Sequence, residues 1–226
     1  FKKNSIGIKG VAYDSKIMPL RIGISNGSIY TSYADNAFDY ARSNGAFVIN
    51  NSWGNSATKV DNVTVGGVPA YFYKPTSDQS LASNFVTAAE AAVNAGIVVV
   101  FSAGNDGWNS QTGQIAVKRD SNNTVLGYYS TDQFSAWSLP ENQVSSPSDY
   151  FLTNSNVSGQ WLSVVALDSD NTIASFSNGC GDAKNYCVAA PGKLINSTVD
   201  TDDNGFSSSY AQSSGTSMAA PVVSAA

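Results

Sequence analysis

The segment FVTAAEAAVNAGIVVVFSAGNDG, residues 85–107, decides the fold class of this chain. Its first half places apolar residues at the spacing of one helix face, namely Phe85, Ala88, Ala89, Ala92 and Val93. Gly96 then ends the helix, and residues 97–102 form a run rich in β-branched side chains that is apolar up to Phe101. Such a run is typical of a strand buried on both faces of a sheet. The segment therefore predicts a helix that leads into a central strand.

The residues before this segment repeat the same alternation of strand and helix. Residues 16–22 are apolar-rich and short enough for a strand, and residues 47–51 predict a second one. Between them, one helix face is formed by Ala34, Ala37, Phe38 and Ala41, and Gly45 stands where a left-handed residue closes a helix. Ser80 is the expected N-cap of the next helix. The order predicts a three-layer α/β fold with a mostly parallel sheet and helices on both faces.

The second half of the chain is less regular. Residues 108–160 are rich in Ser, Asn, Gln, Asp and Tyr, and we interpret them as an insertion with its own hairpin, in which 124–130 is a candidate strand. The sheet pattern resumes at residues 161–167, with short strands expected near 174–176 and 188–190. Residues 216–226 suit a buried helix but show no C-cap signal. We expect one domain over residues 1–226 that is incomplete at both ends.

Composition excludes several classes of protein. Charged residues make up 13% of the chain, about half the roughly 25% usual for soluble domains. The net charge is −5 and Lys/Arg clusters are absent from the sequence, which argues against nucleic acid and anionic membranes as partners. The longest apolar run, residues 97–101, is far shorter than the roughly 20 residues of a membrane helix. We therefore expect no nucleic-acid partner and no membrane contact by this segment.

The sequence contains no histidine, and this restricts the possible chemistry. Zinc held by His and a His general base are both impossible within these residues, and 2 Cys are too few for a thiolate metal site. The run DTDDNG, residues 200–205, matches the first half of a calcium loop, but Ala211 at the twelfth position cannot bind the ion. We interpret it as an exposed turn, with a cation site as the alternative, and expect no cofactor.

The two cysteines, Cys180 and Cys187, lie seven positions apart. In a cytosolic protein they would be two buried thiols. The low charge and the abundance of Ser and Asn favour an oxidising compartment and a small local disulfide instead. Both alternatives remain open from the residues alone.

The segment SGTSMAAP, residues 214–221, carries the strongest chemical signal. A serine at a helix start lies at the positive end of the helix dipole, beside free backbone N–H groups that can bind an oxyanion. Gly215 allows another chain to approach closely, and the small residues that follow allow the helix to be buried. Taken alone, Thr216 or Ser217 could equally be the cap of a buried helix.

The wider pattern resembles the subtilases, the subtilisin-like serine peptidases. Residues 214–221 resemble the segment around the family's nucleophile, and further segments match in the family's order: GVAYDSKI (10–17), VINNSWG (48–54), IVVVFSAGNDG (97–107), ASFSN (174–178) and AAPG (189–192). The resemblance covers nearly all of the chain except residues 108–160. The loop CGDAKNYC and the Val222 that follows Pro221 resemble the subtilase passenger domains of Gram-negative autotransporters, which implies an extracellular or cell-surface location.

The resemblance implies a role for each matching residue. Ser217 would attack the scissile carbonyl, while its own N–H and the side-chain amide of Asn105 would hold the oxyanion. A peptide or protein substrate would lie extended along Ser52, Trp53 and Gly54 and beside Thr216. The other wall of the pocket for the P1 side chain would be formed by Ser102, Ala103 and Gly104. Trp53 is bulkier than the residues usual in this groove, and its side chain could instead pack outward.

The Asp and His of a subtilase triad precede the segment that corresponds to the start of this sequence, and neither motif is present. Ser217 without a base is an ordinary alcohol, so we expect these 226 residues alone not to cleave peptides. We expect the base on an N-terminal segment of the same protein that lies outside this sequence. A degenerate peptidase that only binds peptides and an adhesive surface module are the alternatives. Sedolisins carry Asp where this chain has Asn105, so they fit less well.

Overall fold

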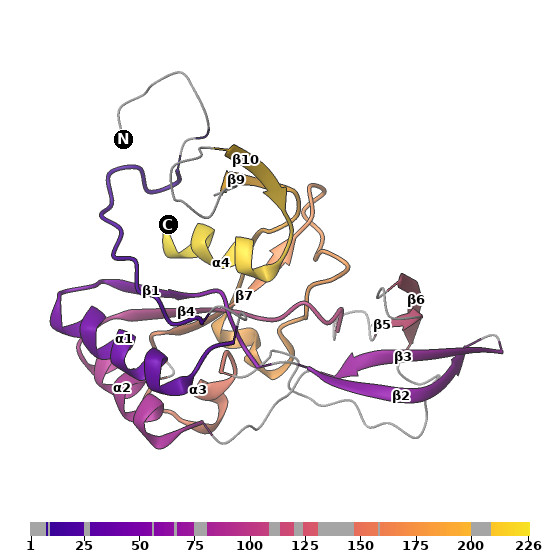
Figure 1. Ribbon diagram of the computed structural model, residues 1–226, viewed down its shortest axis with the longest axis horizontal. Helices are drawn as coiled ribbons and strands as arrows, with labels where there is room; N and C mark the ends of the chain where they lie inside the picture. Colours follow the sequence, from indigo (N-terminus) through magenta and orange to yellow (C-terminus); the bar gives the residue numbers. More distant parts are fainter. Residues whose placement is uncertain are drawn as a thin grey trace.

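The centre of the molecule is a four-stranded parallel sheet in the order β1-β4-β7-β8 (Figure 1). Its strands are β1 (Val48–Asn51), β4 (Val98–Ser102), β7 (Trp161–Leu167) and β8 (Cys187–Pro191). The computed structural model describes residues 8, 10–24, 28–55, 57–65, 67–74, 81–108, 114–119, 124–130, 147–157, 159–199 and 209–226. The expected three-layer α/β architecture is confirmed, because helices cover both faces of this sheet.

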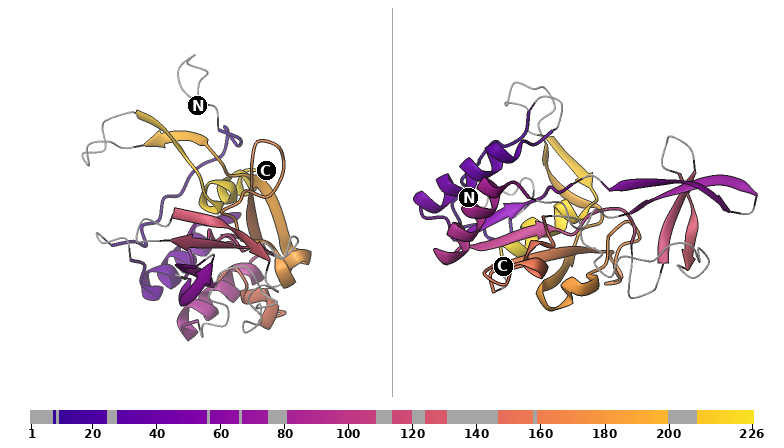
Figure 2. Two further views of the ribbon diagram at one scale, coloured as in Figure 1. Left: turned by 90° about the vertical axis from the view of Figure 1, so that its right-hand side faces the viewer. Right: turned by 90° about the horizontal axis from the view of Figure 1, so that it is seen from below.

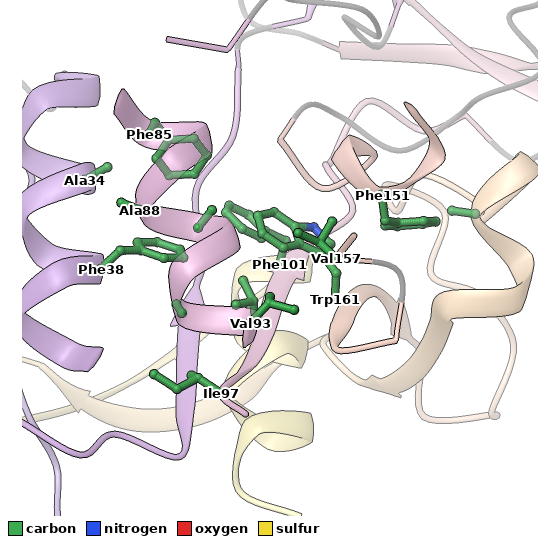
Figure 3. Close-up of a cluster of buried hydrophobic side chains, with 14 of the residues drawn as sticks. Ala34, Phe38, Phe85, Ala88, Val93, Ile97, Phe101, Phe151, Val157 and Trp161 are labelled. Atoms are coloured by element: carbon green, nitrogen blue, oxygen red, sulfur yellow. The ribbon is translucent and has the colours of Figure 1, made fainter. Parts of the chain in front are cut away.

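The two faces of the sheet carry separate apolar clusters. On one face, α1 (Thr31–Ser43) and α2 (Ser83–Asn94) pack over Val99, Phe101 and Trp161 (Figure 3). On the other face, α4 (Thr216–Ser224) packs over Val100 and residues of β7. Because alternate side chains of a strand point to opposite faces, the apolar run of β4 contributes to both clusters. This burial explains why the run contains no polar residue before Ser102.

The two helices predicted in the first half of the chain are confirmed as α1 and α2. All five residues of the predicted apolar face of α2 are buried, and in α1 the buried residues are Ala34, Phe38 and Ala41. Gly45 and Gly96 follow these helices with φ of +73° and +85°, the left-handed conformation expected at a helix end. The N-cap of α2 is Ala82, whereas Ser80 lies outside the described residues. The final predicted helix is α4, whose bounds agree with the prediction to within two residues.

Two predicted strands are wrong. Residues 16–22 are irregular and Ile17 is 81% exposed, because no described strand lies beside them to accept a ladder of hydrogen bonds. Residues 174–176 form a turn closed by the Ser177 N–H and the Ala174 carbonyl at 2.8 Å. The Ala174 N–H still donates to the Ala166 carbonyl of β7 at 2.8 Å, but the Phe176 carbonyl accepts from the Gly107 N–H of the loop after β4 at 2.9 Å, so the segment does not continue along β7.

A second, antiparallel sheet extends to one side of the parallel sheet (Figures 1 and 2). Its order is β2-β3-β5-β6, formed by β2 (Thr58–Val65), β3 (Val68–Lys74), β5 (Gln114–Arg119) and β6 (Thr124–Ser130). The hairpin expected within residues 108–160 is confirmed as β5–β6. The β2–β3 hairpin was not predicted, although Gly66 and Gly67 between two β-rich runs are a standard turn signal.

The remaining elements are α3 (Tyr150–Thr153), the 3₁₀ helix η2 (Gly181–Tyr186), β9 (Ile195–Val199) and β10 (Ser209–Ser213). Of these, α3 precedes β7, η2 lies between β7 and β8, and the antiparallel pair β9 and β10 connects β8 to α4. A disulfide joins Cys180 to Cys187 across η2, which confirms the predicted bridge. The candidate calcium loop at residues 200–205 lies outside the described residues. Within the described part of the chain, no helix is long and apolar enough to cross a membrane.

Candidate active site

The carboxyl ends of β1 and β4 and the N-terminus of α4 meet at one edge of the parallel sheet. Because β1 and β4 are parallel neighbours, the residues that follow them, Ser52 and Ala103, emerge at the same edge. Ser217 is the second residue of α4, so its N–H belongs to the first turn, where N–H groups have no partner within the helix. The structure thus brings together the predicted nucleophile and both predicted loops.

Ser52 and Ser217 exchange two hydrogen bonds. The Ser217 hydroxyl donates to the Ser52 carbonyl at 3.1 Å, and the Ser52 hydroxyl donates to the Ser217 carbonyl at 2.9 Å. Ser52 is itself held from the sheet side, since the amide of Asn50 donates to its hydroxyl at 3.1 Å. These bonds fix the N-terminus of α4 to the end of β1.

Thr216 fixes the orientation of the Asn105 side chain. The Asn105 Oδ1 accepts from the Thr216 N–H at 2.8 Å and from the Thr216 hydroxyl at 3.0 Å. The same hydroxyl accepts from the Gly104 N–H at 3.2 Å. Because two donors hold its oxygen, the Nδ2 end of the Asn105 amide points away from Thr216.

Gly215 leaves open a position that two nitrogens border. A Cβ placed on Gly215 would lie 3.4 Å from the Met218 sulfur, 3.5 Å from Asn105 Nδ2 and 3.6 Å from the backbone nitrogen of Ser217, all ordinary contact distances. Both nitrogens carry hydrogens, and neither carries a formal charge. A negatively charged oxygen near this position would therefore have two donors within reach, next to the Ser217 hydroxyl.

The other predicted substrate-binding residues occupy two different environments. Ser102 and Ala103 are buried beneath the site, and Gly54 is exposed at its edge. The ring of Trp53 packs against Phe101 with centroids 5.2 Å apart, and its indole N–H donates to Asn51 Oδ1 at 3.1 Å. The ring of Trp53 therefore packs against the hydrophobic core.

Two residues of the site had no role in the prediction. Gly192 accepts the Gly215 N–H at 2.8 Å and thereby positions the start of α4. Asn178 is fully buried and hydrogen-bonds to the loop that carries Asn105. Both lie within sequence segments already quoted, AAPG and ASFSN, but their contacts are with residues far away in the sequence, and no local pattern marks them.

The chain belongs to the subtilase family, whose sequence model matches residues 1–226. It is a serine peptidase domain of that family. Serotype-specific antigen 1 of Mannheimia haemolytica is 30% identical over 184 residues, which cover 80% of this chain and 16% of that protein. Subtilisin E of Bacillus subtilis is 29% identical over 223 residues, covering 99% of this chain and 40% of the relative. The chain thus spans well under two thirds of these relatives.

Solved structures agree with the fold. The chain is similar to a protease of Pseudoalteromonas arctica, with a TM-score of 0.60 and 26% identity over 97% of this chain and 51% of the other. It also resembles the prenylagaramide maturation protease PagA, with a TM-score of 0.51 and 20% identity over 88% of this chain and 48% of the other. The second likeness concerns the fold alone.

Proposed function

We propose that this chain is the part of a serine endopeptidase that provides the nucleophile and the oxyanion hole. Ser217 is the nucleophile, and its own N–H together with Asn105 Nδ2 binds the oxyanion. The observation that carries this proposal is that both nitrogens border the same open position at Gly215, at 3.6 Å and 3.5 Å from it. An amide donor suits this role because it stabilises the negative charge of the transition state and adds no charge to the ground state.

The reaction begins when the Ser217 oxygen bonds to the scissile carbonyl carbon. The π electrons of the carbonyl move to its oxygen, which becomes the oxyanion, and the hydroxyl proton passes to a general base. The C–N bond then breaks as that proton is delivered to the leaving amine, and an acyl ester remains on Ser217. Water attacks the ester by the same route and releases the acid.

The general base of a subtilase triad is a histidine, and these 226 residues contain none, so in this proposal the base comes from outside them. The Ser217 proton is directed at the Ser52 carbonyl at 3.1 Å, a group that cannot remove it at neutral pH. We propose that a preceding segment of the same protein supplies the base and its carboxylate partner. In this account the isolated chain does not hydrolyse peptides.

The exposed apolar surface supports this proposal. Among the residues that the structure describes, most of the exposed large apolar side chains lie between residues 8 and 48, for example Ile17, Phe47 and Val48. The outer edge of β1 pairs with no strand among the described residues. A parallel strand added at this edge would bury such side chains, and its carboxyl end would reach the edge of the sheet where Ser217 lies.

The substrate in this proposal is an extended peptide or protein segment. It pairs with the backbone of Ser52, Trp53 and Gly54, while Ser102, Ala103 and Gly104 form the opposite wall of the P1 pocket and Thr216 borders the scissile bond. The inward packing of Trp53 against Phe101 supports this arrangement, since it keeps the indole ring out of the groove.

We further propose that the protein acts outside the cell or at the surface of a Gram-negative bacterium, as a subtilase passenger domain of an autotransporter does. The disulfide between Cys180 and Cys187 supports an oxidising compartment. One relative is the extracellular serine protease of Serratia marcescens, which is 26% identical over 98% of this chain and 22% of that protein. Digestion of intact cells by an added protease, followed by immunoblotting, tests this location.

A catalytically inactive peptide-binding or adhesion module is the second candidate function. The lack of histidine in these residues favours it, whereas the hydrogen bonds from Thr216 that orient Asn105 favour the peptidase. Peptide hydrolysis by the complete gene product separates the two. The peptidase proposal expects turnover that Ser217→Ala abolishes and that the 226-residue chain alone lacks. Peptide binding without turnover by the complete protein would favour the second function.

A further inference from the structure

One buried side chain, that of Asn178, holds both ends and the middle of the loop that carries Asn105, residues 103–108. Asn178 is completely buried, and its Oδ1 accepts from the Asp106 N–H at 2.9 Å and from the Trp108 N–H at 3.4 Å. Its Nδ2 donates to the Ala103 carbonyl at 3.2 Å and to Asp106 Oδ2 at 3.1 Å. One amide side chain thus bonds to both ends and to the middle of the loop.

Backbone contacts place Asn178 accurately against this loop. The Asn178 N–H donates to the Gly104 carbonyl at 3.0 Å, and the Gly107 N–H donates to the Phe176 carbonyl at 2.9 Å. The segment is also tied to the parallel sheet, because the Ala166 N–H of β7 donates to the Ser177 hydroxyl at 3.0 Å. The segment that contains Asn178 is therefore anchored to β7, and the loop is anchored to this segment.

The loop needs such support because of its own conformation. Gly104 and Gly107 have φ of +109° and +75°, values that ordinary residues avoid, and Asn105 between them is exposed. Thr216 holds the Asn105 amide oxygen but makes only one further bond to the loop, at the Gly104 N–H. The backbone on the far side of Asn105 is held by Asn178.

We propose that Asn178 is a positioning residue of the oxyanion hole, which fixes the backbone from which Asn105 reaches the oxyanion. This inference rests on the proposed function. Asn178 does not touch the substrate. It acts by keeping Asn105 Nδ2 in the position where it can donate to the oxyanion. A displacement of about 1 Å at a catalytic group can lower a rate by about 10²-fold. The effect of Asn178 should therefore appear in kcat and should depend on the presence of Asn105.

The kinetic test uses Asn178→Asp in the complete gene product. This change conserves shape but removes both Nδ2 donations and places a second carboxylate beside Asp106. We expect kcat to fall by about 10- to 100-fold and KM to change by less than about twofold. This loss is smaller than the ~10²–10³-fold loss of kcat expected when an oxyanion donor is removed altogether. In an Asn105→Ala background, Asn178→Asp should change kcat by less than about twofold, because the donor that it positions is already gone.

The matched control is Asn154→Asp. Asn154 also directs its Nδ2 at a carboxylate, that of Glu90, but it lies at the end of α3, away from the site. It should lower stability without lowering kcat. If the losses from Asn178→Asp and Asn105→Ala multiply, or if Asn154→Asp lowers kcat equally, Asn178 has only a structural role and the inference is wrong.

A second measurement does not depend on activity. In Asn178→Ala the Asp106 and Trp108 amides lose their acceptor, so their hydrogen exchange should accelerate about tenfold, the equivalent of one hydrogen bond. The Ala103 amide, held by the Val164 carbonyl at 2.9 Å, should keep its protection. Unchanged exchange at Asp106 and Trp108 would overturn the inference. A complete protein that shows this acceleration but no Ser217-dependent turnover would refute the proposed function and leave only the structural contact.

Discussion

Gly192→Ala is the substitution whose consequence follows most directly from the geometry of the site. A Cβ on Gly192 would lie 2.5 Å from the Ala166 Cβ and 2.9 Å from the Gly215 carbonyl oxygen, whereas ordinary contacts begin at 3.4 Å. Neither neighbour is the end of a flexible side chain. The backbone must therefore move by about 0.5–0.9 Å to remove the clashes.

This movement reaches the nucleophile, because Gly215 is the N-cap of α4 and Ser217 lies two residues further on. Overpacking of this kind costs about 1–3 kcal/mol of unfolding free energy. A displacement approaching 1 Å at a reacting group costs about 10²-fold in rate. We therefore expect Gly192→Ala to lower both stability and the rate of acylation.

Urea unfolding and the rate of fluorophosphonate labelling of the complete gene product measure the two effects. The matched control is Gly159→Ala, since no atom lies within 4 Å of a Cβ at that position and its φ is not positive. This control should leave both quantities unchanged within error. A Gly192→Ala variant that is as stable and as reactive as Gly159→Ala would refute the reasoning from the structure.

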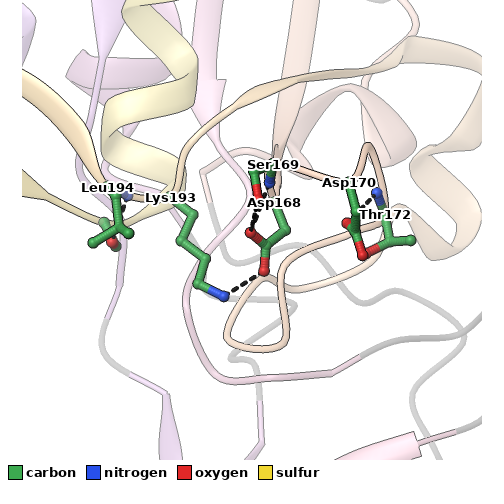
Figure 4. Close-up of polar contacts among 7 residues, drawn as sticks. Asp168, Ser169, Asp170, Thr172, Lys193 and Leu194 are labelled. Atoms are coloured by element: carbon green, nitrogen blue, oxygen red, sulfur yellow. Dashed lines mark hydrogen bonds and ion pairs between the residues drawn. The ribbon is translucent and has the colours of Figure 1, made fainter.

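Three further predictions concern the donor, the disulfide and a surface ion pair. Asn105→Ala should lower kcat by ~10²–10³-fold, a loss known from a member of this same family, with KM little changed in steady-state kinetics. Replacing Cys180 and Cys187 by Ser should lower the unfolding free energy by about 2.5 kcal/mol on the chain-entropy model, measured in urea. The hydrogen bond from Lys193 to Asp168 is the main cause that lowers the pKa of this carboxyl (Figure 4), so its contribution to stability is present above the ordinary pKa and lost as pH falls through the lowered value. Asp168→Asn should therefore lower the free energy of unfolding at neutral pH and make it fall less steeply as the pH is lowered. An unchanged dependence of the unfolding free energy on pH in acid would contradict this assignment.

Much of the parallel sheet could be predicted from local patterns. Phe85, Ala89 and Val93 recur at helical spacing because one face of α2 is buried, and residues 97–101 lack polar side chains because β4 is covered on both faces. Residues 16–22 show the limit of this reasoning. Their apolar content satisfies the strand pattern, but a strand also needs a neighbour, and that requirement is not contained in the segment itself.

The candidate site likewise contains residues that short motifs indicate and residues that no local pattern indicates. Ser217 and Asn105 could be proposed from short motifs, because their local backbones, a helix start and a glycine-rich loop, are encoded by adjacent residues. The support from Asn178 and Gly192 could not, since it depends on the packing of segments that lie more than 20 residues from the groups they hold. The site residues themselves remain predictions until activity is measured.

The most direct test of the central claim is fluorophosphonate labelling of the complete gene product, with the modified residue identified by mass spectrometry. We predict a single adduct on Ser217 that disappears in Ser217→Ala and does not form on the isolated 226-residue chain. Labelling that persists in Ser217→Ala, or equally rapid Ser217-dependent labelling of the isolated chain, would contradict the proposal that this segment provides the nucleophile while another supplies the base.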